Sequence, residues 1–146
     1  MGSISFPRET HGEKAQERLV TCFDVLYELS EVDPANGNGL VEIRRPDDSY
    51  IFVENHTIEG TNQKKGLEPI KADQPAHTVC RKSNILHYKH KRTLTIREMS
   101  RLQSFDYSFK FCGSRKDQVN GIGNAVPVKM AMAVAEAVSV VHRNRT

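Results

Sequence analysis

Apolar residues in this chain are gathered into a few short segments between long polar stretches. In one segment they recur every third position, at Ile96, Met99, Leu102 and Phe105, which places them along one face of a helix. Thr95 and Glu98 match a capping box, in which each side chain bonds the backbone N–H of the other residue. The pattern predicts a short helix that begins after Thr95, buries one face and presents Arg97 and Arg101 on another.

The longest apolar segment runs from residue 127 to residue 141. Pro127 suits the first position of a helix, where a backbone N–H has no intrahelical acceptor. Nearly every later residue is Ala, Val or Met, and the polar residues Lys129, Glu136 and Ser139 share a narrow stripe. A helix that is apolar around most of its circumference must be covered on most of it. It is either a core helix of this chain or, as we favour, a helix that docks on a sheet supplied from outside.

Other segments predict a small mixed structure. A helix is expected over 21–29, and the strands 40–44 and 50–54 are expected to form a hairpin around Pro46-Asp-Asp48. An irregular loop is expected between residues 105 and 121, with Tyr107, Phe109 and Phe111 as aromatic anchors. Gly121 and Gly123 permit a close approach to another backbone or to a ligand.

Composition adds little except through the distribution of charge. The 146 residues suggest one domain, the mean hydropathy of -0.54 is that of a polar chain, and the net charge is only +3. Between residues 81 and 103, however, Glu98 is the only acid among many basic residues. Such a strip is usually a solvated face, but it is also typical of phosphate binding.

Metal and disulfide chemistry are not indicated. Cys22, Cys80 and Cys112 lack the spacing of a zinc site or a disulfide framework, which favours reduced intracellular thiols. His87 and His90 have no acidic or thiol partner nearby in the sequence. We therefore expect no metal, and the absence of a signal peptide or a long apolar run gives no reason to expect a membrane.

Two segments resemble signature motifs of the cytosine-5 DNA methyltransferases. Residues 92–105, Arg-Thr-Leu-Thr-Ile-Arg-Glu-Met-Ser-Arg-Leu-Gln-Ser-Phe, resemble the ninth motif of that family, and residues 123–127, Gly-Asn-Ala-Val-Pro, resemble the tenth. Residues 6–12 are similar to the segment after the eighth motif, and residues 74–78 to a short Pro-Ala-Pro-Thr element. The chain departs from the family where Asp106 follows Phe105 without an intervening Pro, and where Val128 replaces a second Pro.

The resemblance implies a fragment of an α/β family. As it stands the chain would be α+β: a small recognition-region hairpin plus helices that would pack on an absent Rossmann-like methyltransferase domain. Residues 1–36 would form a connector and a helix, 37–90 a short target-recognition-like region, and 91–146 the part that contains motifs nine and ten.

The resemblance also implies roles for individual residues, none of them catalytic. In the family a Cys that follows Pro adds to the cytosine ring and S-adenosylmethionine supplies the methyl group, whereas here Thr21, Val79 and Phe111 precede the cysteines. Asn124 and Ala125 would border S-adenosylmethionine. Contacts to DNA are expected from Arg81, Lys82, Lys89, Lys91, Arg92 and Arg101. The motif framework would consist of Thr95, Arg97, Glu98, Gln103, Gly123 and Pro127.

Three hypotheses follow. The chain is the C-terminal part of a DNA (cytosine-5-)-methyltransferase, inactive alone and completed by a large domain or subunit; or it is a non-catalytic DNA-binding or regulatory module derived from such an enzyme; or it is a small structural protein with accidental motifs. The first two predict double-stranded DNA as a partner. They also predict an intracellular location, in the nucleus of a eukaryote or in the cytoplasm of a bacterium.

Overall fold

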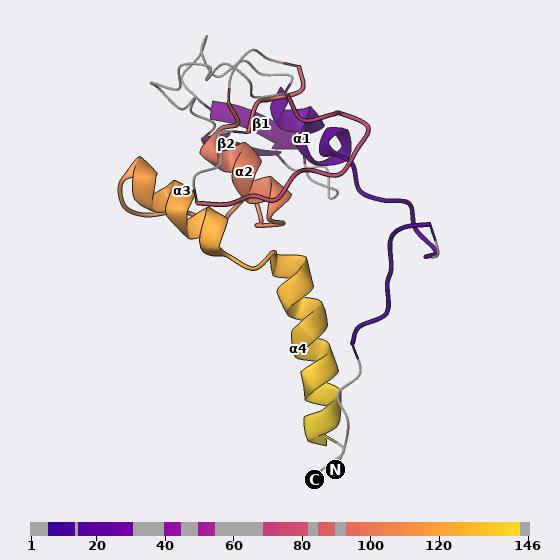
Figure 1. Ribbon diagram of the computed structural model, residues 1–146. Helices are drawn as coiled ribbons and strands as arrows, with labels where there is room; N and C mark the ends of the chain where they lie inside the picture. The colour runs from indigo at the N-terminus through magenta and orange to yellow at the C-terminus, as the bar shows by residue number, and fades with distance from the viewer. Residues whose placement is uncertain are drawn as a thin grey trace.

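The computed structural model describes residues 6–13, 15–30, 40–44, 50–54, 69–81, 85–89 and 93–143. In chain order its elements are α1 (Cys22–Ser30), β1 (Leu40–Arg44), β2 (Tyr50–Glu54), α2 (Ile96–Leu102), α3 (Arg115–Asn124) and α4 (Val128–Arg143). Figure 1 shows α1, α2 and the hairpin gathered in one body, with α3 beside it and α4 extending away. The described chain is therefore α+β, as expected.

The predicted hairpin is confirmed. β1 and β2 pair antiparallel, with Ile43 opposite Ile51 and Leu40 opposite Glu54. The expected turn at Pro46-Asp-Asp48 lies outside the described residues, as does the segment 55–68.

The predicted helix over 21–29 is confirmed as α1. Its start is a reciprocal cap: Thr21 Oγ1 accepts from the backbone N–H of Asp24 at 3.3 Å, and the Asp24 carboxylate accepts from that of Thr21 at 2.8 Å. Arg18 donates to both carboxylate oxygens of Asp24 at 2.7 Å. These bonds hold the pKa of Asp24 well below its usual range, with the Arg18 hydrogen bonds as the largest cause.

The start of α1 and the segment around residues 72–74 run beside each other. The backbone N–H groups of Cys22 and Phe23 donate to the carbonyls of Gln74 and Ala72, at 2.8 and 2.9 Å. Farther along, Leu86 lies between Pro69 and Thr93 in two isolated bridges. Neighbouring backbone therefore ties α1 to the chain that leads into α2.

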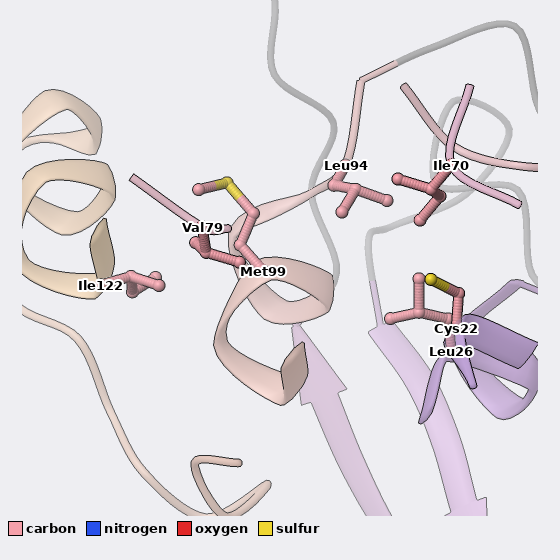
Figure 2. Packing of buried hydrophobic residues seen from close by; sticks show 7 residues of the cluster. All are labelled: Cys22, Leu26, Ile70, Val79, Leu94, Met99 and Ile122. Carbon is pink, nitrogen blue, oxygen red and sulfur yellow. The ribbon is translucent and has the colours of Figure 1, made fainter. Parts of the chain in front are cut away.

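The core is a row of apolar side chains drawn from three helices and the connecting segments, shown in Figure 2: Cys22, Leu26, Ile70, Val79, Leu94, Met99 and Ile122. Met99 of α2 stands in the middle, between Ile122 of α3 and the α1 residues. Ile96 and Leu102 pack against this row, so the predicted apolar face of α2 is buried as expected.

The prediction of an irregular loop between residues 105 and 121 is wrong for residues 115–121, because α3 begins at Arg115. The helix starts with a capping box in which Ser114 Oγ accepts from the N–H of Asp117 and the Asp117 carboxylate accepts from that of Ser114. The Ser114 hydroxyl, which donates to the Asp117 carboxylate at 2.6 Å, and the Ser114 N–H lower the pKa of Asp117. Gly121 and Gly123 therefore lie inside a helix and not in a loop.

The predicted C-terminal helix is confirmed as α4, which begins directly after Pro127; the Pro127 carbonyl accepts its first helical bond, from Ala131 at 2.9 Å. In Figure 1 α4 extends from the body as a separate rod. Many of its apolar side chains are exposed within the described chain: Met130, Met132, Val134, Val138 and Val140. No other described helix covers this surface, so α4 is not a core helix of the described residues.

Candidate functional site

Helix α2 begins with the predicted capping box. Thr95 Oγ1 accepts from the N–H of Glu98 at 3.1 Å, and Glu98 Oε2 accepts from the N–H of Thr95 at 2.8 Å. Both side chains are fully buried. Because both capping hydrogen bonds are formed and both side chains are buried, the cap fixes the residue at which the helix begins. It thereby also fixes which face of the helix meets the core.

α2 ends with a Schellman arrangement. The N–H of Phe105 donates to the Ser100 carbonyl at 3.0 Å, and the N–H of Ser104 donates to the Arg101 carbonyl at 2.9 Å. Ser104 adopts the left-handed conformation, with a φ of 58°. This conformation turns the chain away from the helix axis and into the aromatic segment that follows.

Both guanidinium groups that α2 was expected to present have partners within the chain. Arg97 donates to the Phe109 carbonyl at 2.9 Å and lies over the Phe111 ring. Arg101 donates to the Phe105 carbonyl at 2.5 Å, with its guanidinium carbon 4.1 Å from the centre of the Tyr107 ring. Carbonyl acceptors and ring faces in the next loop therefore bind both cations. A phosphate contact by Arg101 remains a prediction, but this group is already bound within the chain.

The loop that these arginines hold is an aromatic cluster, as expected for its first half. The rings of Phe105, Phe109 and Phe111 lie in mutual contact, with centroids 4.9 to 5.3 Å apart. Tyr107 points the other way and donates to Glu28 of α1 at 3.1 Å. Burial raises the pKa of Tyr107 to about 12.

Gln103 joins the end of α2 to the corner between α3 and α4. Its side-chain amide donates to the carbonyls of Ile122 and Ala125, at 3.1 and 3.3 Å. Its own carbonyl accepts from the N–H of Val128 at 3.0 Å, at the start of α4. One buried residue thus holds the end of α3, the turn after it and the first turn of α4.

Gly123 permits a close backbone approach, as the sequence suggested. A Cβ at this position would lie 2.4 Å from the backbone N of Arg81 and from the backbone C of Cys80. Real Cβ atoms do not approach other atoms so closely. α3 therefore packs directly against the segment that contains Arg81, and only glycine fits.

The two residues expected to border the cofactor lie at the corner between α3 and α4. Asn124 is exposed as the last residue of α3. Ala125 is half-buried; its N–H donates to the Ile122 carbonyl at 3.2 Å, and its carbonyl is bound by Gln103. The Ala125 backbone is therefore satisfied internally, which leaves the Asn124 side chain as the group available to a ligand.

The predicted DNA-contacting residues are only partly described. Arg81 and Lys89 are exposed, whereas Lys82, Lys91 and Arg92 lie outside the described residues. Arg81 stands beside α3 through its contact with Gly123. Their contact with DNA remains a prediction.

A buried contact that the sequence did not reveal lies beside the cap of α2. His87 Nε2 is 3.6 Å from Glu98 Oε1, and neither side chain is accessible to solvent. His87 has no acidic residue near it in the sequence, but the fold brings Glu98 beside it. Eleven positions separate the two residues, and no local pattern could have paired them.

Other chemistry finds little support in the part of the chain that the structure describes. No group of three or more His, Cys, Asp or Glu there could hold a metal ion, and no helix there could cross a membrane. Cys22 is buried, which raises its pKa, while Cys80 and Cys112 are exposed thiols. A buried thiol with a raised pKa is a poor nucleophile.

A family model for C-5 cytosine-specific DNA methylases matches residues 9–140, and so spans most of these elements. The chain belongs to this family. Its similarity to the methylases therefore extends well beyond motifs nine and ten, from the segment before α1 through most of α4.

Three relatives illustrate the range of lengths. The type II methyltransferase M1.HphI of Haemophilus parahaemolyticus is 45% identical, over 98% of this chain and 41% of its own length. The DNA (cytosine-5)-methyltransferase CMT2 of Arabidopsis thaliana is 41% identical, over 64% of the chain and 7% of its own length. The type II methyltransferase M.AquIB of Picosynechococcus sp. is 39% identical, over 68% of the chain and 78% of its own length. The chain thus spans less than half of the first two relatives.

Proposed function

We propose that this chain is the C-terminal part of a DNA (cytosine-5-)-methyltransferase, which contributes DNA contact and completes an S-adenosylmethionine domain. The rest of that domain, with the nucleophilic Cys, would be supplied by a large domain or subunit. The chain by itself would be inactive, because covalent activation of cytosine has no starting step without the thiolate.

The observation that carries this proposal is the uncovered apolar surface of α4. Met130 is 59% exposed and Val134 45% exposed, and burying each such side chain stabilises by roughly 1.5–3 kcal/mol. A contiguous apolar surface of this kind is typical of an interface. Because Gln103 joins α4 to the end of α3, a sheet that covered α4 would lie close to Asn124.

The S-adenosylmethionine role fits this corner. The exposed carboxamide of Asn124 offers both a donor and an acceptor beside the half-buried Ala125. When bound, S-adenosylmethionine would supply the methyl group. This chain would contribute one edge of its pocket, and Gln103 would hold that edge in place.

The relatives support a chain of this size. M1.HphI is much longer, so the activity in its name includes parts that this chain does not match. M.AquIB is itself of comparable length, since an alignment of 113 residues spans 78% of it. The family thus includes a short protein that is similar to this one.

The test is complementation by a matched large part. The portion of M1.HphI that this chain does not match would be coexpressed with the chain, and methyl transfer from labelled S-adenosylmethionine to mixed-sequence DNA would be measured. We expect incorporation with both parts and none with either alone. Incorporation by the chain alone would overturn the proposal.

The second candidate, a non-catalytic DNA-binding or regulatory module, is favoured by the exposed Arg81 and Lys89 and by the missing nucleophile. It predicts salt-sensitive binding to any duplex, a monodisperse chain without a partner, and no complementation. The proposed function instead predicts that the chain aggregates or is partly unfolded until it is coexpressed.

A further inference from the structure

His87 is buried, at 1% exposure, between two groups that face opposite sides of its ring. Nδ1 accepts the backbone N–H of Lys89 at 2.9 Å. Nε2 faces Glu98 Oε1 at 3.6 Å. The ring also stacks on Tyr88, with centroids 4.5 Å apart. The hydrogen bond at Nδ1 and the stacked ring of Tyr88 together fix the orientation of the imidazole.

The hydrogen bond from Lys89 determines the protonation state. A ring nitrogen that accepts an N–H has no proton of its own, so the imidazole is neutral and its proton is on Nε2. That proton points toward the carboxylate whose other oxygen closes the cap of α2. A buried carboxylate is strongly destabilising unless donors surround it, and the His87 N–H faces the oxygen that the cap does not use.

We propose that His87 is a positioning residue which, as the neutral Nε2–H tautomer, couples the cap of α2 to the backbone of Lys89. Glu98 lies beside Nε2 of the ring, and Nδ1 of the ring accepts a hydrogen bond from the main chain from which the exposed Lys89 side chain extends. Lys89 is then fixed relative to α2 before any ligand arrives. Only the consequence for DNA affinity rests on the proposed function; the tautomer and the support of the cap do not.

The first experiment needs no substitution. Nitrogen NMR of the full chain labelled with ¹⁵N-histidine, in complex with the large part if required, should show one histidine with an unprotonated Nδ1 and a protonated Nε2 near neutral pH. His87→Gln assigns that signal by its loss. A proton on Nδ1 would overturn the inference.

The second experiment separates positioning from charge. His87→Asn keeps an acceptor near the place of Nδ1, whereas His87→Gln keeps a donor near the place of Nε2 and loses the acceptor. Affinity for a mixed-sequence duplex would be measured over a range of salt concentrations. We expect His87→Gln to weaken binding roughly three- to ten-fold, as for one lost hydrogen bond, with an unchanged salt slope, and His87→Asn to stay near wild type.

Lys89→Ala is the matched control, because removing one phosphate contact lowers the magnitude of the salt slope by about 0.9. If the slope is unchanged in Lys89→Ala, Lys89 makes no phosphate contact and the positioning role has no effect on DNA affinity, while the tautomer still stands or falls on the NMR measurement. If Lys89→Ala behaves as expected but His87→Gln, shown by circular dichroism to be folded, binds as tightly as wild type, the positioning role is refuted.

Discussion

Gly123→Ala is the substitution whose effect the structure defines most sharply. The new Cβ would lie 2.4 Å from the Cys80–Arg81 backbone, whereas ordinary contact begins at 3.4 Å. The backbone on either side is not a flexible side chain that can rotate away. α3 must therefore move outward by about 1 Å, and a gap of that size forfeits roughly a quarter to a half of the dispersion energy across it.

That movement would separate Ile122, which is fully buried, from Val79 and Met99 in the core row. Forced overpacking of this kind destabilises by roughly 1–3 kcal/mol. For a domain of this size, thermal unfolding should begin roughly 2–4 °C lower for each kcal/mol. The measurement is the midpoint of thermal unfolding of the full chain, with the large part present if α4 makes the chain aggregate.

Gly121→Ala is the matched control in the same helix, because a Cβ at Gly121 would meet nothing within 4 Å. There alanine should stabilise by ~0.5–1 kcal/mol through its higher helix propensity. The two alanines should thus shift the midpoint in opposite directions. Equal shifts, or a stabilising Gly123→Ala, would refute the claim that backbone packing requires glycine at position 123.

Three other predictions concern separate parts of the chain. Val134→Asp places a charge on the uncovered surface of α4 and should abolish solubilisation by the large part, while Glu136→Gln should not; a compact monomer unaffected by Val134→Asp would show that no partner covers this surface. Gln103→Ala removes two hydrogen bonds to carbonyls, so it should destabilise by ~1–3 kcal/mol and weaken S-adenosylmethionine binding by the assembled protein; unchanged unfolding would contradict its joining role. The pKa of Tyr107, raised to about 12, lies above the unfolded value near 10, so its stabilising effect is complete below pH 10 and is lost as the pH rises toward 12. Tyr107→Phe should remove that part of the pH dependence of unfolding, and tyrosinate absorbance of the folded chain should show one fewer late-titrating tyrosine.

Elements that are determined by neighbouring residues could be predicted from the sequence. The cap of α2 needs only Thr95 and Glu98, and the apolar spacing that follows indicates which face is buried. α3 was missed because Asp117 replaces the longer Glu or Gln of the usual capping box, and because its two glycines and Asn124 have low helix propensity.

The directions of long side chains could not be predicted in the same way. The spacing of Arg97 and Arg101 places them on one face, but their partners are carbonyls and rings in a loop that folds back on α2. The same is true of His87 and Glu98, which meet only because residues 85–89 pack beside the start of α2. For such residues the sequence predicts the chemistry and the tertiary structure determines the partner.

The 16 residues of α4 give it a length of ~24 Å, and the bonds from Gln103 lie at its first turn. α4 is therefore attached to the rest of the described chain at its first turn, through the hydrogen bonds of Gln103. A rotation of about 10° at that turn would displace the far end by ~4 Å, close to the width of a methyl group. Alignment of distant side chains such as Val138 with a complementary surface is thus set by hydrogen bonds at the other end of the helix. A substitution at Gln103 would therefore displace the far end of α4 most, although that end does not contact Gln103.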